Sequence, residues 1–254
     1  MPTLKQPQLK LNTWKFVERY LRGSRAVLVP IGATEQHGPN GIIGTDTVCA
    51  EEVAIRAGAK AGVLVAPTIN VGMSLHHMAF PGSMSLQPET LIAVIRDYVS
   101  SLYAHGFRGF MFVNGHGGNI ASGQAAFSGI SEVHRDARLE WYNWWDCEAL
   151  GKLSTKLFGD REGAHATPTE VALTMAVYPD DVKGVKGPLN IKNCRFHGIP
   201  GSREFRKLYP DGRIASDPSM STPENGAQVL EVAVVGAIRA VRALAKRVAP
   251  KKRR

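Results

Sequence analysis

The chain has 254 residues and a formal net charge of +9, with 44% hydrophobic and 21% charged residues. This composition is close to the average of globular proteins and excludes a disordered or fibrous chain. No apolar run reaches the roughly 18 residues of a membrane span, and the N-terminus lacks the apolar core of a secretory signal. The three scattered cysteines fit neither a disulfide framework nor a CxxC metal site, so a cytoplasmic location is expected.

Short apolar runs alternate along the chain with patterns of helical period. Strands are predicted at residues 26–31, 63–67, 109–113 and 137–145, and helices at 46–58, 88–103, 119–134, 167–177 and 222–246. Residues 178–220 are rich in Gly, Pro, Asp and Lys and are predicted to be irregular. Alternating strands and helices favour an α/β fold with a mainly parallel sheet that helices cover on both faces.

The positive charge is concentrated at the C-terminus. Six basic residues and no acidic residue lie within 246–254, and without those six the net charge falls from +9 to +3. A basic tail can bind nucleic acid or a membrane surface, but such ends more often only add solubility. We therefore predict a single domain over 1–245 and a basic tail over 246–254, with a small-molecule substrate and neither nucleic acid nor membrane as a partner.

Three polar clusters each follow a predicted strand. The first carries Glu35, His37 and Asp46, the second carries His116, and the third carries His165 and Glu170. In open parallel sheets, ligands bind beyond the carboxyl ends of the strands, where loops from distant parts of the chain meet. We therefore expect the clusters to share one pocket.

The side chains of these clusters favour a metal site. Three carboxylates and three imidazoles without a thiolate suit Zn, Mn, Fe or Co. Six candidate ligands exceed the three that a one-zinc catalytic site uses, whereas two ions roughly 3.5–4 Å apart that share a carboxylate would use them well. Two divalent ions, zinc first and manganese or iron as alternatives, are the predicted cofactors.

Each cluster also has a purely structural interpretation. Asp46 precedes a predicted helix and could be its N-cap. The glycines around His116 could form a strand-to-helix turn or a phosphate-binding nest. Thr167-Pro168-Thr169-Glu170 has the pattern of a capping box, with Pro at the first helical position.

The clusters together resemble the creatininase family of metal-dependent amidohydrolases. The resemblance runs in order from about residue 27 to 230, through Glu35-Gln-His37-Gly38-Pro39, Gly44-Thr45-Asp46-Thr47, Phe80-Pro-Gly82-Ser, Asn114-Gly-His116-Gly-Gly-Asn119, His165 with Glu170, and Asp217-Pro218-Ser with Glu224 and Gly226.

The resemblance implies a three-layer α/β/α sandwich with two metals. Glu35 and His116 would bind one metal, His37 and Glu170 the other, and Asp46 would bridge them. It also implies hydrolysis of a C–N bond in a cyclic amide or formamide by a metal-bridging hydroxide, and a homo-oligomer, with a hexamer as one form. Either His165 or the His76-His77 pair, with His77 as the candidate, would donate the proton.

Two departures from the family pattern argue against creatinine as the substrate. Creatinine hydrolases of the family have an acidic residue where this chain has Gly118, and a Glu where it has Ala164. Glu170 is then the metal ligand that substitutes for the acidic residue absent at position 118. Asn40 stands where the family usually has the His of a Gly-Pro-His sequence. A cyclic ketone or a peptide is the alternative substrate, and a phosphate- or nucleotide-binding module is the alternative of a different class.

The aromatic run Trp141, Tyr142, Trp144 and Trp145 is expected in the core or a subunit interface, with the pocket wall as the alternative.

Overall fold

A computed structural model describes residues 3–182 and 200–250. Its centre is a sheet of four parallel strands in the order β2-β1-β3-β4, formed by β1 (Ala26–Ile31), β2 (Leu64–Val65), β3 (Gly109–Asn114) and β4 (Arg138–Asn143). Ile31 pairs with Asn114, and Asn114 pairs with Asn143, so three strands end at the same edge of the sheet. The loops that leave this edge therefore start side by side.

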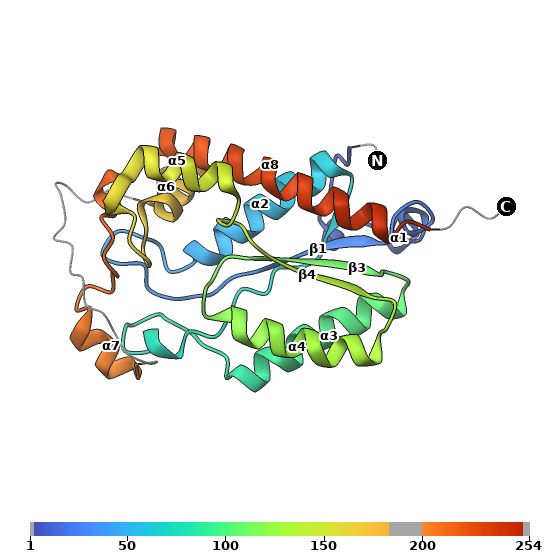
Figure 1. The fold of residues 1–254 in the computed structure, drawn as a ribbon, viewed down its shortest axis with the longest axis horizontal. Coiled ribbons are helices and arrows are strands. Elements are labelled where there is room, and N and C mark those ends of the chain that lie inside the picture. Colours follow the sequence, from blue (N-terminus) through green and yellow to red (C-terminus); the bar gives the residue numbers. More distant parts are fainter. Residues whose placement is uncertain (1–2, 183–199, 251–254) are drawn as a thin grey trace.

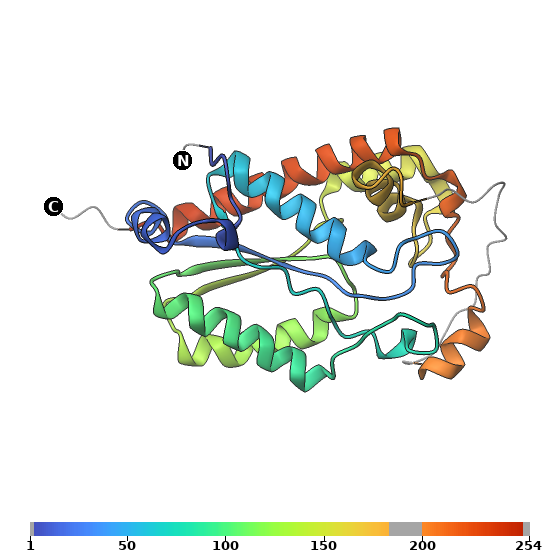
Figure 2. The same cartoon turned by 180° about the vertical axis from the view of Figure 1, so that it is seen from behind.

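Helices cover both faces of the sheet, which confirms the three-layer α/β/α fold (Figures 1 and 2). One face is covered by α3 (Pro88–Ala104) and α4 (Asn119–Val133), and the other by α2 (Thr45–Ala61), α5 (Glu148–Phe158), α6 (Pro168–Val177) and α8 (Pro223–Arg247).

The alternation of side chains along the central strands builds two cores. Leu28 and Met111 belong to the cluster that packs against the α2 and α8 side, whereas Val29 and Phe112 belong to the cluster on the α3 and α4 side. Every residue of β1 and β3 is buried. Continuous apolar runs of this kind are expected where a parallel strand is covered on both faces.

Among the described residues, three α-helices were not predicted from the sequence. These are α1 (Trp14–Leu21), α5, and α7 (Ser202–Leu208), which lies in the stretch predicted to be irregular. A short helix such as α7 has little intrinsic stability, and packing decides its formation. Its Phe205 is 2% exposed and stacks edge-on against His77. Residues 183–199 of that stretch lie outside the described part.

The last helix extends beyond its predicted end. α8 runs to Arg247, and Val248 is buried in the core, so the first residues assigned to the basic tail continue the fold. The division into a domain and a tail stays a prediction, because residues 251–254 are outside the described ranges. Within those ranges, no helix is long and apolar enough to cross a membrane.

Candidate metal centre

The three polar clusters meet at the carboxyl edge of the sheet. The loop after β1 carries Glu35 and His37, the first turn of α2 carries Asp46, and the loop after β3 carries His116. The backbone of Gly32 after β1 approaches the start of α2, where a Cβ on Gly32 would lie 2.5 Å from Thr47 Cα. The close approach of loop and helix brings the side chains together, and it requires glycine.

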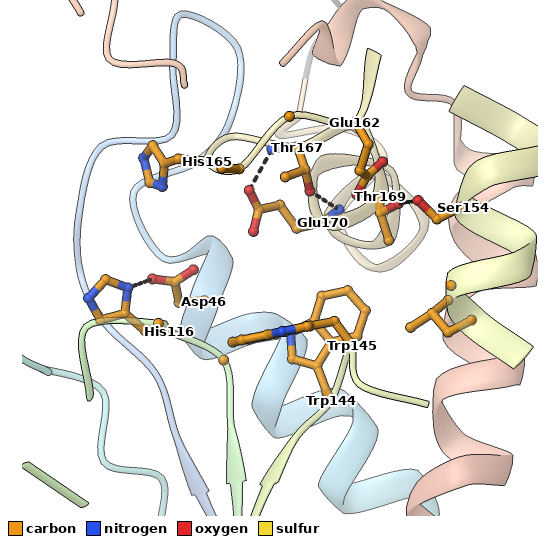
Figure 3. Close-up of a pocket in the computed structure, with 16 residues that line it drawn as sticks. Asp46, His116, Trp144, Trp145, Ser154, Glu162, His165, Thr167, Thr169 and Glu170 are labelled. Atoms are coloured by element: carbon orange, nitrogen blue, oxygen red, sulfur yellow. Dashed lines mark hydrogen bonds and ion pairs between the residues drawn. The ribbon is translucent and has the colours of Figure 1, made fainter. Parts of the chain in front are cut away.

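Asp46 lies between two histidines. Its Oδ1 is 3.0 Å from His37 Nε2. Its Oδ2 is 3.1 Å from His116 Nδ1, and Figure 3 shows this second contact. Glu35 Oε1 lies 3.3 Å from His116 Nδ1. The cap of α2 is Gly44, and Asp46 is the second residue inside the helix, so the interpretation of Asp46 as an N-cap is wrong.

Glu170 completes a capping box with one carboxylate oxygen and faces the centre with the other. Its Oε1 accepts a hydrogen bond of 2.6 Å from the Thr167 backbone N–H, and Thr167 Oγ1 accepts one from the Glu170 N–H, which completes the capping box. Its Oε2 faces the centre, 3.9 Å from His37 Nε2. The capping box thus fixes the direction in which this carboxylate points.

Backbone carbonyls fix the tautomers of His37 and His116. His37 Nδ1 lies 3.1 Å from the Glu35 carbonyl oxygen, and His116 Nε2 lies 3.0 Å from the Met73 carbonyl oxygen. A carbonyl only accepts, so these nitrogens carry the protons. In the neutral ring, the opposite nitrogen of each histidine carries its lone pair on the side of the carboxylates, which is how metal-binding histidines are usually oriented.

Gln36 fixes the tautomers of two further histidines, His77 and His165. Its Oε1 accepts from the Gly38 N–H, so the amide orientation is set, and its Nε2 donates to the Gly212 carbonyl and to His77 Nδ1, both at 2.9 Å. His77 therefore carries its proton on Nε2, which lies 3.3 Å from Glu35 Oε1.

His165 has the opposite orientation toward the centre. Its Nε2 is 2.8 Å from the Gln36 carbonyl oxygen and so carries the proton. Its Nδ1 lone pair faces Glu35 Oε1 at 3.7 Å. His165 presents an acceptor to the centre, whereas His77 presents a donor.

The residues present fit a pair of metal ions. Glu35, His37 and Asp46 each bury a side-chain atom without a directed hydrogen bond, and ion-pair distances of 3.0 to 3.3 Å join these groups to one another and to His116. Buried polar atoms without partners cost about 1–3 kcal/mol each, and more when charged. Metal ligation would satisfy them. Three groups within the described chain could hold an ion: Glu35, Asp46 and His116; His37, His165 and Glu170; and Glu35, His77 and His165.

Without metal, protons replace the missing positive charge. Burial alone would lower the pKa of His37, but the Asp46 carboxylate raises it to about 10. Burial raises the pKa of Glu170 to about 7. Burial and the charge of His37 lower the pKa of His165 to about 4, so its ring is neutral at pH 7.

The glycines after β3 serve close packing. A Cβ on Gly115 would lie 2.0 Å from the Asp46 carbonyl oxygen, and one on Gly118 would lie 2.3 Å from His116 Nε2. Their backbones therefore lie against the protein's own groups, which favours the turn over the phosphate nest. An acidic side chain at position 118 would require this loop to move, which is consistent with Glu170 as the alternative carboxylate.

A cavity of about 380 Å³ adjoins the centre (Figure 3). Asp46, His116, His165 and Glu170 line one part of it, and Trp144 and Trp145 line another. The aromatic run thus serves both expected purposes, because Trp141 stacks on Phe112 in the core while Trp144 and Trp145 reach the cavity.

Sequence reasoning missed two polar residues of this region. Gln36 lies between Glu35 and His37, and only that position in the sequence pointed to it. Glu162 lines the cavity, three residues before His165, and no motif singled it out.

Comparisons with known proteins agree with the geometry. A model of the family described as creatininase, creatinine amidohydrolase, matches residues 10–241. The chain is 31% identical over 224 residues to the mycofactocin precursor peptide peptidase of Mycolicibacterium smegmatis, covering 83% of this chain and 81% of the relative. It is 26% identical over 249 residues to the creatinine amidohydrolase of Pseudomonas putida, covering 91% and 94%.

A solved structure described as creatininase Mn has a TM-score of 0.84 and 25% sequence identity, covering 94% of this chain and 98% of the other. The fold, the order of the motifs and the family model agree over most of the chain. The chain belongs to the creatininase family of amidohydrolases.

Proposed function

We propose that this chain is a metal-dependent hydrolase of amide C–N bonds. The observation that carries the proposal is the buried set of carboxylate and imidazole atoms that face one another at 3.0 to 3.3 Å and lie close enough together to share a metal ion. Glu35 and His116 would hold one divalent ion, His37 and Glu170 the other, and Asp46 both, because its two oxygens face the two histidines. Zinc is the expected metal, with manganese or iron as alternatives. When bound, the ions would polarise the substrate carbonyl and lower the pKa of water.

The two free histidines take different roles. His165 keeps a lone pair on Nδ1, so it would take up a proton there and return it to the leaving nitrogen. His77 has its proton on the side of Glu35, so it would orient that carboxylate. Gln36 holds both rings in these tautomers and is a positioning residue. His165→Gln is expected to abolish turnover while metal content is kept.

The substrate is an amide, and creatinine is not favoured. Gly118 and Ala164 remove two acidic groups of the family pattern, and a cavity of about 380 Å³ lies within the size range of sites for drug-sized ligands. A cyclic amide or formamide remains one candidate. A peptide bond is the second, because the relative that is 31% identical is a peptide peptidase.

Metal analysis with a substrate panel tests the proposal. The protein is stripped with a chelator, reloaded with zinc, manganese or iron, and assayed on creatinine, formamides and peptides. We expect about two ions per chain and amide hydrolysis that is lost on stripping and restored on reloading. Full activity of the metal-free protein, or no bound metal after reloading, would refute the proposal.

A further inference from the structure

The cavity extends from the metal-centre ligands to a second polar region. There Glu162 lies among the hydroxyl-bearing residues Ser154, Thr167 and Thr169, which line the same cavity (Figure 3). Glu162 precedes Gly163, whose φ of +66° turns the chain toward His165. The proposed metal ligands do not include Glu162, so its presence in the wall calls for a separate explanation.

One of the two oxygens of the Glu162 carboxyl group is left without a partner by the described residues. This oxygen, Oε2, is buried. Burial raises the pKa of Glu162, and hydrogen bonding with Thr169, Ser154 and Thr167 opposes that effect only in part. In the described ranges no lysine or arginine forms an ion pair with it, and the neighbouring Arg161 is paired with Asp217.

A second unsatisfied group lines the same cavity. The side chain of Trp144 is buried, with only 2% of the residue exposed, and its Nε1 has no hydrogen-bond partner in the described chain. An indole N–H is a donor only, and the carboxylate is an acceptor. The residues that line the cavity therefore include one donor and one acceptor that the described residues do not pair.

The proposed metal centre does not require the negative charge of Glu162. Glu35, Asp46 and Glu170 already provide three carboxylates for two divalent ions. Glu162 is a fourth, away from the ion pairs of the centre, and a buried carboxylate oxygen without a partner is costly. A cationic N–H group would satisfy both its charge and its hydrogen-bonding capacity, and such bonds are among the strongest in proteins.

We propose that Glu162 is a specificity-determining residue that binds a cationic N–H group of the substrate, so that the enzyme acts on amides carrying a basic group away from the scissile bond. The inference rests on the proposed amide hydrolysis. Trp144 would donate to an oxygen of the same substrate.

Hydroxamates allow Glu162 to be tested without knowledge of the substrate, because the hydroxamate group chelates metal ions. The probes are ω-amino alkyl hydroxamates of increasing chain length and their methyl-ended counterparts, and binding to the metal-loaded protein is followed by the fluorescence of the cavity tryptophans. At one chain length we expect the ammonium probe to bind about tenfold to hundredfold more tightly than its counterpart, as a hydrogen bond to a charged group would provide.

Glu162→Gln should abolish this preference and leave the methyl-ended probes unaffected. Glu148→Gln is the matched control, because Glu148 lies on α5, is 83% exposed and pairs with Lys152. No ammonium preference at any length, or a preference that survives in Glu162→Gln, would overturn the proposal.

The failure of the proposed function would look different. If the metal-loaded protein binds neither kind of hydroxamate, the metal centre is refuted, and n-butylamine against n-butanol then tests Glu162 directly. Tighter binding of the amine in wild type than in Glu162→Gln would support the proposal, and equal binding would overturn it.

Discussion

Glu170→Gln separates the metal-binding role of Glu170 from its capping role. The capping box needs an acceptor for the Thr167 N–H, and a glutamine amide oxygen supplies one. The loss of negative charge near the start of α6 costs about 0.3–1 kcal/mol of helix stability. As a cap alone, the substituted side chain should therefore work almost as well as the native one.

In the metal-free protein, the burial of Glu170 should make Glu170→Gln a stabilising substitution. Glu170 is 15% exposed, and burial raises its pKa from 4.5 to about 7. A carboxyl whose folded pKa is raised destabilises the fold as the pH rises from its unfolded value through its folded one. At pH 8 the ionised group thus costs the metal-free fold about 3 kcal/mol, which glutamine avoids. Metal-free Glu170→Gln should be as stable as wild type, or more stable.

The metal-loaded protein should show the opposite effect. Glu170 faces His37, and its replacement removes one of three anionic ligands, so bound metal should fall from about two ions per chain toward one, with most activity lost. Elemental analysis and thermal unfolding, each with and without chelator, measure both effects. Glu89→Gln, in the first turn of α3, is the control for a lost charge near a helix start. Wild-type metal content and rate in Glu170→Gln would refute the reasoning and leave Glu170 a capping residue.

Three further outcomes follow from the same geometry. Asp46→Ala should lose both ions, because the oxygens of Asp46 lie 3.0 and 3.1 Å from two different histidines. His116→Ala should keep one ion. Equal losses of metal in the two variants on elemental analysis would exclude a bridging role for Asp46. Metal affinity, measured by chelator competition, should depend on pH, because a bound proton must leave each ligand before the metal binds. The affinity should fall about tenfold per pH unit below the raised pKa of His37, about 10, and more steeply below the raised pKa of Glu170, about 7. An affinity that does not change with pH would contradict this. Deletion of residues 249–254 should leave the rate within about a factor of two, since α8 and its packing end before them, and a large loss would mean that the tail contributes to the site.

The sequence predicted well where one local signal was sufficient. The continuous apolar runs at 26–31 and 109–113 predicted two buried strands, and Pro88 with its helical spacing predicted the start of α3. The capping box at Thr167 was visible because its partners are three residues apart. Elements held by tertiary packing were missed, as in α7, where Phe205 packs on the histidine cluster.

The sequence by itself determined the chemistry of the site: carboxylates and imidazoles after the strands, in the order of a known family, without a thiolate. Only the tertiary structure decided how each of them is used. It placed Asp46 between two histidines, and it let one oxygen of Glu170 cap a helix while the other faces His37. Through Gln36 and backbone carbonyls it also distinguished His165 from His77. The physical reason is that a tautomer or a ligand direction depends on hydrogen bonds between residues far apart in the chain, and no local pattern records them.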